Sequence, residues 1–570
     1  MRQLLRLQSN RLPLIAAALG AGALVAALLV ASPMAAADAP QGSPLHPVFA
    51  LLDADGQNVL DSGNPVSTME TCGQCHETAF IAEHNQHAGL LTGALEGPAG
   101  EQVMVSPDSG ELVALGEAAA SAEVNCFLCH STRPSNAARL QALGAGQVEW
   151  ANTATLLDTG LVARSGEGYE WNRAAFAEDG TLLPDYVGIH DPSVNNCAQC
   201  HGIATTDASE PLVVDTCSDE QRLTTTTGVI FAPQRISLSG LNVSGKAELT
   251  RSWDVHAERI VGCTDCHYSL NNPAYAAKPA DSSPEHLVFD PRRLDPGEYL
   301  SRPVHDLARS GDDTVTQGAC TSCHAVTTTH DWLPYTDRHM EALACESCHV
   351  PEVEAPAYQA VDWTVLTSTG LPGVTCRGQE TSGQGGQALI TGYQPVLLPR
   401  ETVDGQEVIA PHNLIATWYW AYGEEAQPVA LADLQAAYFD GGAYHPDVLA
   451  AFDADGDGAL NRAELVIDTE AKETLVAGRL AALGLQDPRI EATTDAYPVN
   501  HGVTHGDWAI KECTECHGED SRLAAPLALV GGNPPGGVTP RAGDGLPHSG
   551  GDIVSGDGGA IFFQPHTGQP

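Results

Sequence analysis

The sequence predicts a mostly α-helical and irregular fold in which bound cofactors form much of the core, with one EF-hand-like insertion. Three observations lead to this prediction. The pattern Cys-x-x-Cys-His occurs seven times in the 570 residues. Aromatic residues make up only 5% of the chain, while glycine (57) and proline (37) are abundant, so loops are expected to wrap cofactors that replace part of the side-chain core. One later stretch, rich in aspartate, has the register of a calcium-binding loop.

The seven motifs are typical of covalent haem attachment. Two cysteines separated by two residues reach both vinyl groups of one haem, and the histidine that follows lies under the iron as its proximal ligand. Zinc sites and disulfides also use Cys-x-x-Cys, but neither requires histidine at the next position. We therefore expect seven c-type haems. In chain order the motifs are site 1 (Cys72, Cys75, His76), site 2 (Cys126, Cys129, His130), site 3 (Cys197, Cys200, His201), site 4 (Cys263, Cys266, His267), site 5 (Cys320, Cys323, His324), site 6 (Cys345, Cys348, His349) and site 7 (Cys513, Cys516, His517).

Histidines outside the motifs are numerous enough to supply a second ligand to every iron. Of the 22 histidines seven belong to the motifs, which leaves 15. Bis-histidine ligation gives low-potential, six-coordinate haems compared with Met/His ligation. The candidate distal ligands are His84, His87, His190, His256, His305, His330, His339, His412, His501 and His505.

The N-terminus resembles a secretory signal. Arg2, Arg6 and Arg11 precede an apolar run over residues 12–30, and small residues before Asp38 suit cleavage, so residues 1–37 are expected to be a signal peptide. The run is long enough to leave an uncleaved N-terminal anchor as an open alternative. Both interpretations predict a periplasmic or extracellular protein, anchored to the membrane if the signal is uncleaved.

The chain is strongly acidic. Its 72 acidic residues against 27 basic ones give a formal net charge of −45. Nucleic acids and anionic lipids require a basic surface, so both are excluded as partners, and membrane contact is expected only through an N-terminal anchor. The remaining partner classes are redox proteins with a basic docking surface and a quinol-linked membrane donor. Adaptation to a saline habitat is a second explanation of the acidity and stays open.

Two cysteines lie outside the motifs. Cys217 and Cys376 are an even remainder in an oxidising compartment, so they are candidates for one disulfide. The bridge would tie the haem-rich region to the segment that follows it.

Motif spacing divides the chain into regions. Sites 1 to 6 fall within residues 44–356, an insertion occupies 357–490, site 7 lies within 491–523, and residues 524–570 read as a flexible, glycine- and proline-rich tail. Only 20 residues separate His324 from Cys345. Sites 5 and 6 are therefore expected to be the closest pair.

The insertion contains a candidate calcium site. Its twelve residues place oxygen ligands at positions 1, 3, 5, 7, 9 and 12 of an EF-hand loop, with glycine at position 6. Helices are expected at residues 446–452 and 470–483. The predicted ligands are Asp453, Asp455, Asp457, the carbonyl of Ala459, Asn461 and Glu464.

The seven motifs resemble those of multihaem c-type cytochromes over residues 45–520. The stretch from Cys345 to Pro351, preceded by His339, resembles sites in octahaem cytochromes related to tetrathionate reductase. Those enzymes carry eight haems and a lysine-ligated iron, whereas this chain has seven motifs and no Cys-x-x-Cys-Lys.

Two functions follow from these features. The supply of histidine favours an electron carrier with mainly bis-histidine haems over a catalyst. The alternative is an oxidoreductase that acts on tetrathionate, nitrite or hydroxylamine at one open haem.

Overall fold

The computed structural model describes residues 46–566 with gaps. Those not described are 1–45, 77, 85–86, 88–94, 107–108, 117–121, 167, 205–211, 213–222, 260, 264–266, 269–301, 304–319, 321–323, 325–328, 381–387, 403–404, 548 and 567–570. The predicted signal peptide, Cys217, Cys266, Cys323 and His305 fall in these gaps.

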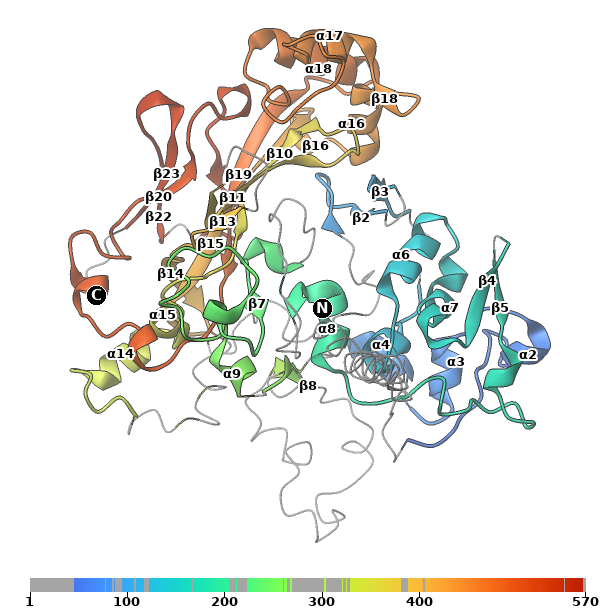
Figure 1. The fold of residues 1–570 in the computed structure, drawn as a ribbon. Coiled ribbons are helices and arrows are strands. Elements are labelled where there is room, and N and C mark those ends of the chain that lie inside the picture. Colours follow the sequence, from blue (N-terminus) through green and yellow to red (C-terminus); the bar gives the residue numbers. More distant parts are fainter. Residues whose placement is uncertain are drawn as a thin grey trace, which may run out of the picture.

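The prediction of a mostly α-helical and irregular fold is wrong, because a seven-stranded sheet organises the C-terminal half (Figure 1). Strands run in the order β11-β10-β15-β19-β21, and two further strands pair with β15. Their bounds are β10 (Ala357–Leu366), β11 (Pro372–Arg377), β14 (Val396–Glu401), β15 (Glu407–Tyr422), β16 (Gln427–Pro428), β19 (Arg489–Pro498) and β21 (Arg541–Ala542). β15 is antiparallel to β14, β16 and β19 and parallel to β10, so it lies at the centre of the sheet.

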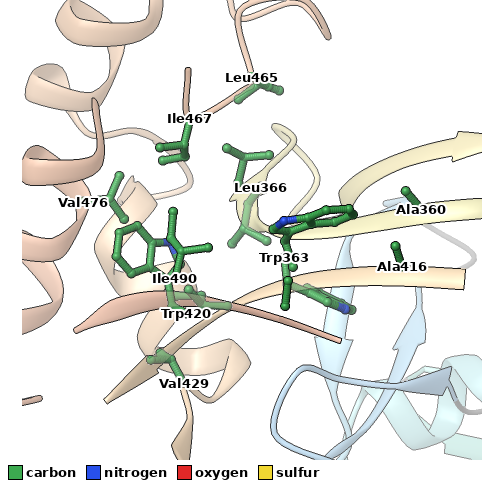
Figure 2. Packing of buried hydrophobic residues seen from close by; sticks show 14 of the residues in the cluster. Ala360, Trp363, Leu366, Ala416, Trp420, Val429, Leu465, Ile467, Val476 and Ile490 are labelled. Carbon is green, nitrogen blue, oxygen red and sulfur yellow. The ribbon is translucent and has the colours of Figure 1, made fainter. Parts of the chain in front are cut away.

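The sheet forms because its central strand is apolar on both faces. From Val408 to Ala421 nearly every residue of β15 is buried, and Trp418 and Trp420 are at most 1% exposed. The Trp420 indole N–H donates to the Thr364 carbonyl (3.0 Å), so burial leaves this polar group hydrogen-bonded. Figure 2 shows Trp420 packed with Trp363, Leu366, Val476 and other apolar residues of this core.

Helices of the insertion pack against this core (Figure 1). The helix predicted for residues 446–452 is confirmed as α17, and the one predicted for 470–483 is confirmed as α18. The elements here are α16 (Leu431–Tyr438), β17 (Phe439–Asp440), β18 (Ala443–Tyr444), α17 (Pro446–Phe452) and α18 (Glu470–Ala482).

The expectation of a flexible C-terminal tail is also wrong. β20 (Leu527–Val530), β23 (Ile561–Pro565) and β22 (Gly551–Ser555) form a three-stranded antiparallel sheet. Leu529 and Phe563 are fully buried in the same core as Trp420. A few apolar residues among many glycines are thus enough to attach the chain end to the large sheet.

The haem-motif region is helical with short strands and has two cores of its own. Its first half contains α2 (Val59–Ser62), α3 (Thr68–Gly73), α4 (Thr78–His84), β1 (Leu95–Glu96), β2 (Gln102–Val105), β3 (Leu112–Ala114), α5 (Cys126–His130), α6 (Asn136–Gly144), α7 (Ala151–Ala154), β4 (Val162–Ser165), β5 (Gly168–Trp171) and α8 (Val194–His201). Its second half contains β6 (Ile203–Ala204), β7 (Ile230–Phe231), α9 (Val255–Glu258), β8 (His267–Tyr268), β9 (Arg302–Pro303), α14 (Thr336–Ala342) and α15 (Glu346–His349). A short pair of strands, β12 (Gln379–Glu380) and β13 (Leu389–Ile390), lies in the insertion. Site 7 lies on α19 (Thr514–His517).

Short 3₁₀ helices fill several connections: η2 (Val148–Trp150), η3 (Leu157–Thr159), η4 (Arg173–Ala175), η5 (Leu223–Thr226), η6 (Ile236–Leu238), η10 (Gly506–Trp508), η11 (Pro535–Gly537) and η12 (Asp557–Gly559). Within the described ranges, no helix combines the length and apolarity needed to cross a membrane.

The sheet holds site 6 in place. The Ile409 carbonyl, near the start of β15, accepts hydrogen bonds from the Ala344 N–H (2.9 Å) and the Ser347 hydroxyl (2.7 Å). Both donors flank Cys345. The C-terminal half therefore positions part of the motif region directly.

Candidate functional site

The motifs of sites 1, 2, 3, 6 and 7 each form about one turn of helix. The N–H of the final histidine donates to the carbonyl of the first cysteine in site 1 (2.9 Å), site 5 (2.9 Å), site 6 (3.0 Å) and site 7 (2.8 Å). Residues three and four apart share one helix face. This turn therefore presents both thiols and the imidazole of a motif to one cofactor.

Four motif histidines face a second histidine that belongs to the segment next to another motif. Ring centroids are 6.0 Å apart in the site 3 pair, 6.3 Å in the site 5 pair, 5.9 Å in the site 6 pair and 6.2 Å in the site 7 pair. The pairs are His87 with His201, His256 with His324, His330 with His349, and His339 with His517.

This spacing fits an iron held between two imidazoles. With a metal–nitrogen bond of about 2 Å on each side, two trans imidazole rings have centroids about 6 Å apart. Direct packing of two rings has no such fixed spacing, since aromatic pairs range over roughly 4.5–7 Å. Four pairs that agree within 0.4 Å, each containing one motif histidine, fit axial haem ligation.

Two motif histidines have one ring nitrogen fixed by a hydrogen bond to the backbone. Nδ1 of His349 hydrogen-bonds the Thr504 carbonyl (2.8 Å), and Nδ1 of His130 hydrogen-bonds the His190 carbonyl (2.9 Å). A proton on Nδ1 leaves the Nε2 lone pair free for a metal. His190 thus contributes its backbone to site 2.

The other candidate distal ligands are placed as follows. His412 is buried in β15, where its Nδ1 hydrogen-bonds the Ala410 carbonyl (2.9 Å), and the described residues contain no ring contact between it and a motif histidine. His501 and His505 are themselves exposed and lie on the segment after β19. The side chain of His84 is outside the described set, as is His305. The side chain of His267, the predicted proximal ligand of site 4, is also outside it.

First cysteines of successive motifs lie in pairs. The thiols of Cys72 and Cys126 (sites 1 and 2) are within hydrogen-bonding reach of each other. The same holds for sites 3 and 4 and for sites 5 and 6, through Cys197 with Cys263 and Cys320 with Cys345. A thiol here stands for the thioether carbon–sulfur bond of the haem-loaded protein. Porphyrin edges in each pair would therefore lie next to each other.

Second cysteines connect these pairs. Cys129 of site 2 interacts electrostatically with Cys200 of site 3, and Cys348 of site 6 does so with Cys516 of site 7. The remaining link comes from His256, which stands just before site 4 and faces the site 5 histidine. Sites 1 to 7 thus follow one another in space in the order in which they occur in the sequence.

A buried arginine accompanies each contact between second cysteines. Arg139 (2% exposed) lies near Cys129 and Cys200, and Arg522 (4% exposed) lies near Cys348 and Cys516. Burial lowers the pKa of both guanidinium groups, and the neighbouring cysteines oppose that shift. Arg522 donates to the carbonyls of Ser347 (2.8 Å) and Pro395 (3.1 Å), which hold it between sites 6 and 7.

Backbone and side-chain hydrogen bonds fix α5 relative to α8. Asn125 caps α5 by accepting from the Leu128 N–H (3.1 Å). Asn196, on α8, donates through its amide to the carbonyls of Leu128 (3.0 Å) and Ser131 (2.9 Å). These hydrogen bonds hold the helices of sites 2 and 3 together without any contribution from a cofactor.

Asp254, which the sequence did not single out, lies directly behind the candidate ligand His256. It is 1% exposed, and its carboxylate accepts hydrogen bonds from the backbone and the Nδ1 of His256. Burial would raise the pKa of Asp254, but the hydrogen bonds from His256 and from the Val503 N–H hold it below its usual value. The available signal was the pattern Asp-x-His, in which the carboxylate caps the first turn of α9.

The predicted calcium loop brings its first three carboxylates together. Candidate ligand oxygens of Asp453, Asp455 and Asp457 all lie within 4.8 Å of one another. Glu464 is 7% exposed and accepts from the N–H groups of Ala454 (2.8 Å) and Asn461 (3.0 Å), which close the loop. These oxygens suit a hard cation such as calcium, which remains a prediction.

Cys376, on β11, is disulfide-bonded. The other cysteines that the structure describes are thiols and not disulfides. Its predicted partner, Cys217, lies outside the described residues, so the pairing itself stays a prediction.

Comparison with known proteins finds one distant structural likeness. No family model and no curated protein matches the chain. The structure is similar to the crystal structure of an octahaem cytochrome c from Shewanella oneidensis, with 14% identity and a TM-score of 0.34, over 79% of this chain and 90% of the other. At this score the likeness establishes neither fold nor function.

Proposed function

We propose that this chain is a heptahaem c-type cytochrome that carries electrons in the periplasm or at the cell surface. The observation that carries the proposal is the set of four histidine pairs, each joining a motif histidine to a histidine near another motif at 5.9–6.3 Å. When bound, each haem supplies a reversible one-electron couple between ferric and ferrous iron.

The order of the sites supports conduction along the whole chain. First-cysteine contacts join sites 1 and 2, 3 and 4, and 5 and 6, and second-cysteine contacts join 2 to 3 and 6 to 7. Each transfer oxidises one site by one electron and reduces its neighbour by one. No substrate chemistry is needed along this route.

Electrons would enter and leave at the two ends. Cys75 of site 1 and Cys513 of site 7 are exposed, whereas the described cysteines of sites 2 to 6 are half-buried. Site 7 is surrounded by exposed acidic residues: Glu512, Glu515, Glu519 and Asp520. A redox protein with a basic surface fits this end, and a quinol-linked membrane donor is the other candidate partner.

Catalysis is the second candidate function, and geometry limits where it would occur. Sites 3, 5, 6 and 7 already have a second histidine at ligating distance. An open iron that reduces tetrathionate, nitrite or hydroxylamine would therefore lie at site 1, 2 or 4.

Reoxidation of the loaded protein separates the two functions. The holoprotein is reduced anaerobically with one electron per haem and mixed with an outer-sphere ferric chelate or with each of the three substrates. An electron carrier is reoxidised by the chelate in all haems and gives no turnover with the substrates. Sustained turnover of any substrate would replace the carrier function by the catalytic one.

A further inference from the structure

The carboxylate of Asp254 is held by four hydrogen bonds in the interior of the protein. Its Oδ1 accepts from the backbone N–H (2.8 Å) and the ring Nδ1 (3.0 Å) of His256. Its Oδ2 accepts from the N–H groups of Gly502 and Val503 (both 2.9 Å). Four donors around one carboxylate keep it ionised and fix its direction.

Two of these donors, Gly502 and Val503, come from a segment that also holds the next site. Val503 accepts at its carbonyl from the Val255 N–H (2.9 Å), and Thr504 exchanges hydrogen bonds with His349. Residues 502–504 therefore clamp the distal histidine of site 5 and the proximal histidine of site 6 together. Asp254 has little freedom to turn away from His256.

In the site 5 pair, the ring N–H of His256 meets the carboxylate of Asp254 (3.0 Å). Nδ1 of His349 meets a backbone carbonyl (2.8 Å), and Nδ1 of His339 meets the Tyr335 carbonyl (3.2 Å). Nδ1 of His330 contacts the Thr329 hydroxyl (3.0 Å). These three partners are neutral.

A carboxylate behind a ligating histidine changes the metal. It draws the ring proton toward itself, raises the basicity of the ligating nitrogen and places a negative charge near the iron. Both effects stabilise ferric over ferrous iron, so the reduction potential falls. Neutral carbonyl and hydroxyl partners have a smaller effect.

We propose that Asp254 makes site 5 lower in potential than sites 6 and 7, so that site 5 separates electrons held on sites 6–7 from electrons held on sites 1–4. This inference rests on the proposed function. Electrons still cross site 5, because it lies between sites 4 and 6. They spend little time on it, because its low potential disfavours the ferrous state. The protein would then hold electrons for two partners separately.

The test is a potentiometric titration of the holoprotein, followed by visible and low-temperature electron paramagnetic resonance spectra. In Asp254→Asn the Asn side chain keeps the cap of α9 but loses the negative charge. One haem equivalent should leave the low-potential part of the titration and move upward, with the other haems unchanged. Asp447→Asn is the matched control, since Asp447 also pairs with a histidine (His445, 3.6 Å) but lies in α17.

A second variant identifies the wave even if Asp254→Asn is poorly folded. His256→Met replaces a histidine ligand by methionine, which raises the potential of that haem. The wave that disappears from the low-potential part in His256→Met must be the one that moves in Asp254→Asn. The proposal would be overturned if His256→Met lost a wave from the high-potential part of the titration. It would also be overturned if folded Asp254→Asn titrated like the wild type. Failure of the carrier function is separate, because it would appear as sustained turnover of a substrate by the wild type.

Discussion

The imidazole of His87 lies 6.0 Å, centroid to centroid, from the imidazole of His201, although the two residues belong to the neighbourhoods of sites 1 and 3. The same cross-connection recurs at three more sites, where the second histidine comes from beside a different motif. Ligation of one iron would therefore tie two motif segments together. Haem incorporation and folding of the motif region should depend on each other.

Replacing His87 tests this connection. His87→Ala should remove the sixth ligand from site 3 and convert one of seven haems from low-spin to high-spin, visible in the electron paramagnetic resonance spectrum. The unfolding midpoint of the loaded protein should fall as well, because a metal-mediated cross-link is lost. His566→Ala is the control, since His566 hydrogen-bonds Asp552 in the C-terminal sheet (3.0 Å) and faces no motif histidine in the described structure. An unchanged spin state in His87→Ala would show that His87 is not a ligand.

Arg522 should raise the potentials of sites 6 and 7. A buried positive charge between two irons stabilises the added electron on each, and low exposure reduces solvent screening. Arg522→Gln should shift two haem equivalents to lower potential, whereas Arg522→Lys, which keeps the charge, should retain most of the effect. Arg541→Gln removes an exposed arginine and controls for net charge. If Arg522→Gln and the wild type give the same redox titration, Arg522 does not influence the reduction potentials of sites 6 and 7.

Calcium should bind the loop that follows α17. Carboxylates of Asp453, Asp455 and Asp457 repel one another at their observed spacing, and a cation would relieve that repulsion. Glu464→Gln should weaken calcium uptake in calorimetry at least tenfold, about 1.4 kcal/mol, and increase protease cleavage within residues 440–485. The haem count should not change. If the chelator-treated wild type takes up no calcium, the loop is an acidic turn and not a calcium site.

Local patterns in the sequence predicted the helices on either side of the acidic loop, because each helix depends on residues close together in the chain. The large sheet was missed because β15 is buried on both faces, so its near-continuous apolar run lacks the alternation of a half-buried strand. The tail was misjudged because few residues, Leu529 and Phe563 among them, provide its attachment.

The distal partners were not predictable in the same way. A histidine such as His339 stands immediately before site 6, yet it faces His517 of site 7. Sequence distance gives the length of a tether, while the choice of partner depends on how distant segments pack. Asp254 was missed for a related reason, since its second oxygen is held by Gly502 and Val503 from far along the chain.

The most direct test of the account is a haem count combined with a spin-state measurement on the mature wild-type protein. A pyridine haemochrome assay with intact mass should give seven haems per chain, and the oxidised protein should be low-spin without binding carbon monoxide after reduction. Five or fewer haems from a host with a working maturation system would contradict the assignment of all seven motifs. A substantial high-spin fraction that binds carbon monoxide would contradict the account of a bis-histidine electron carrier.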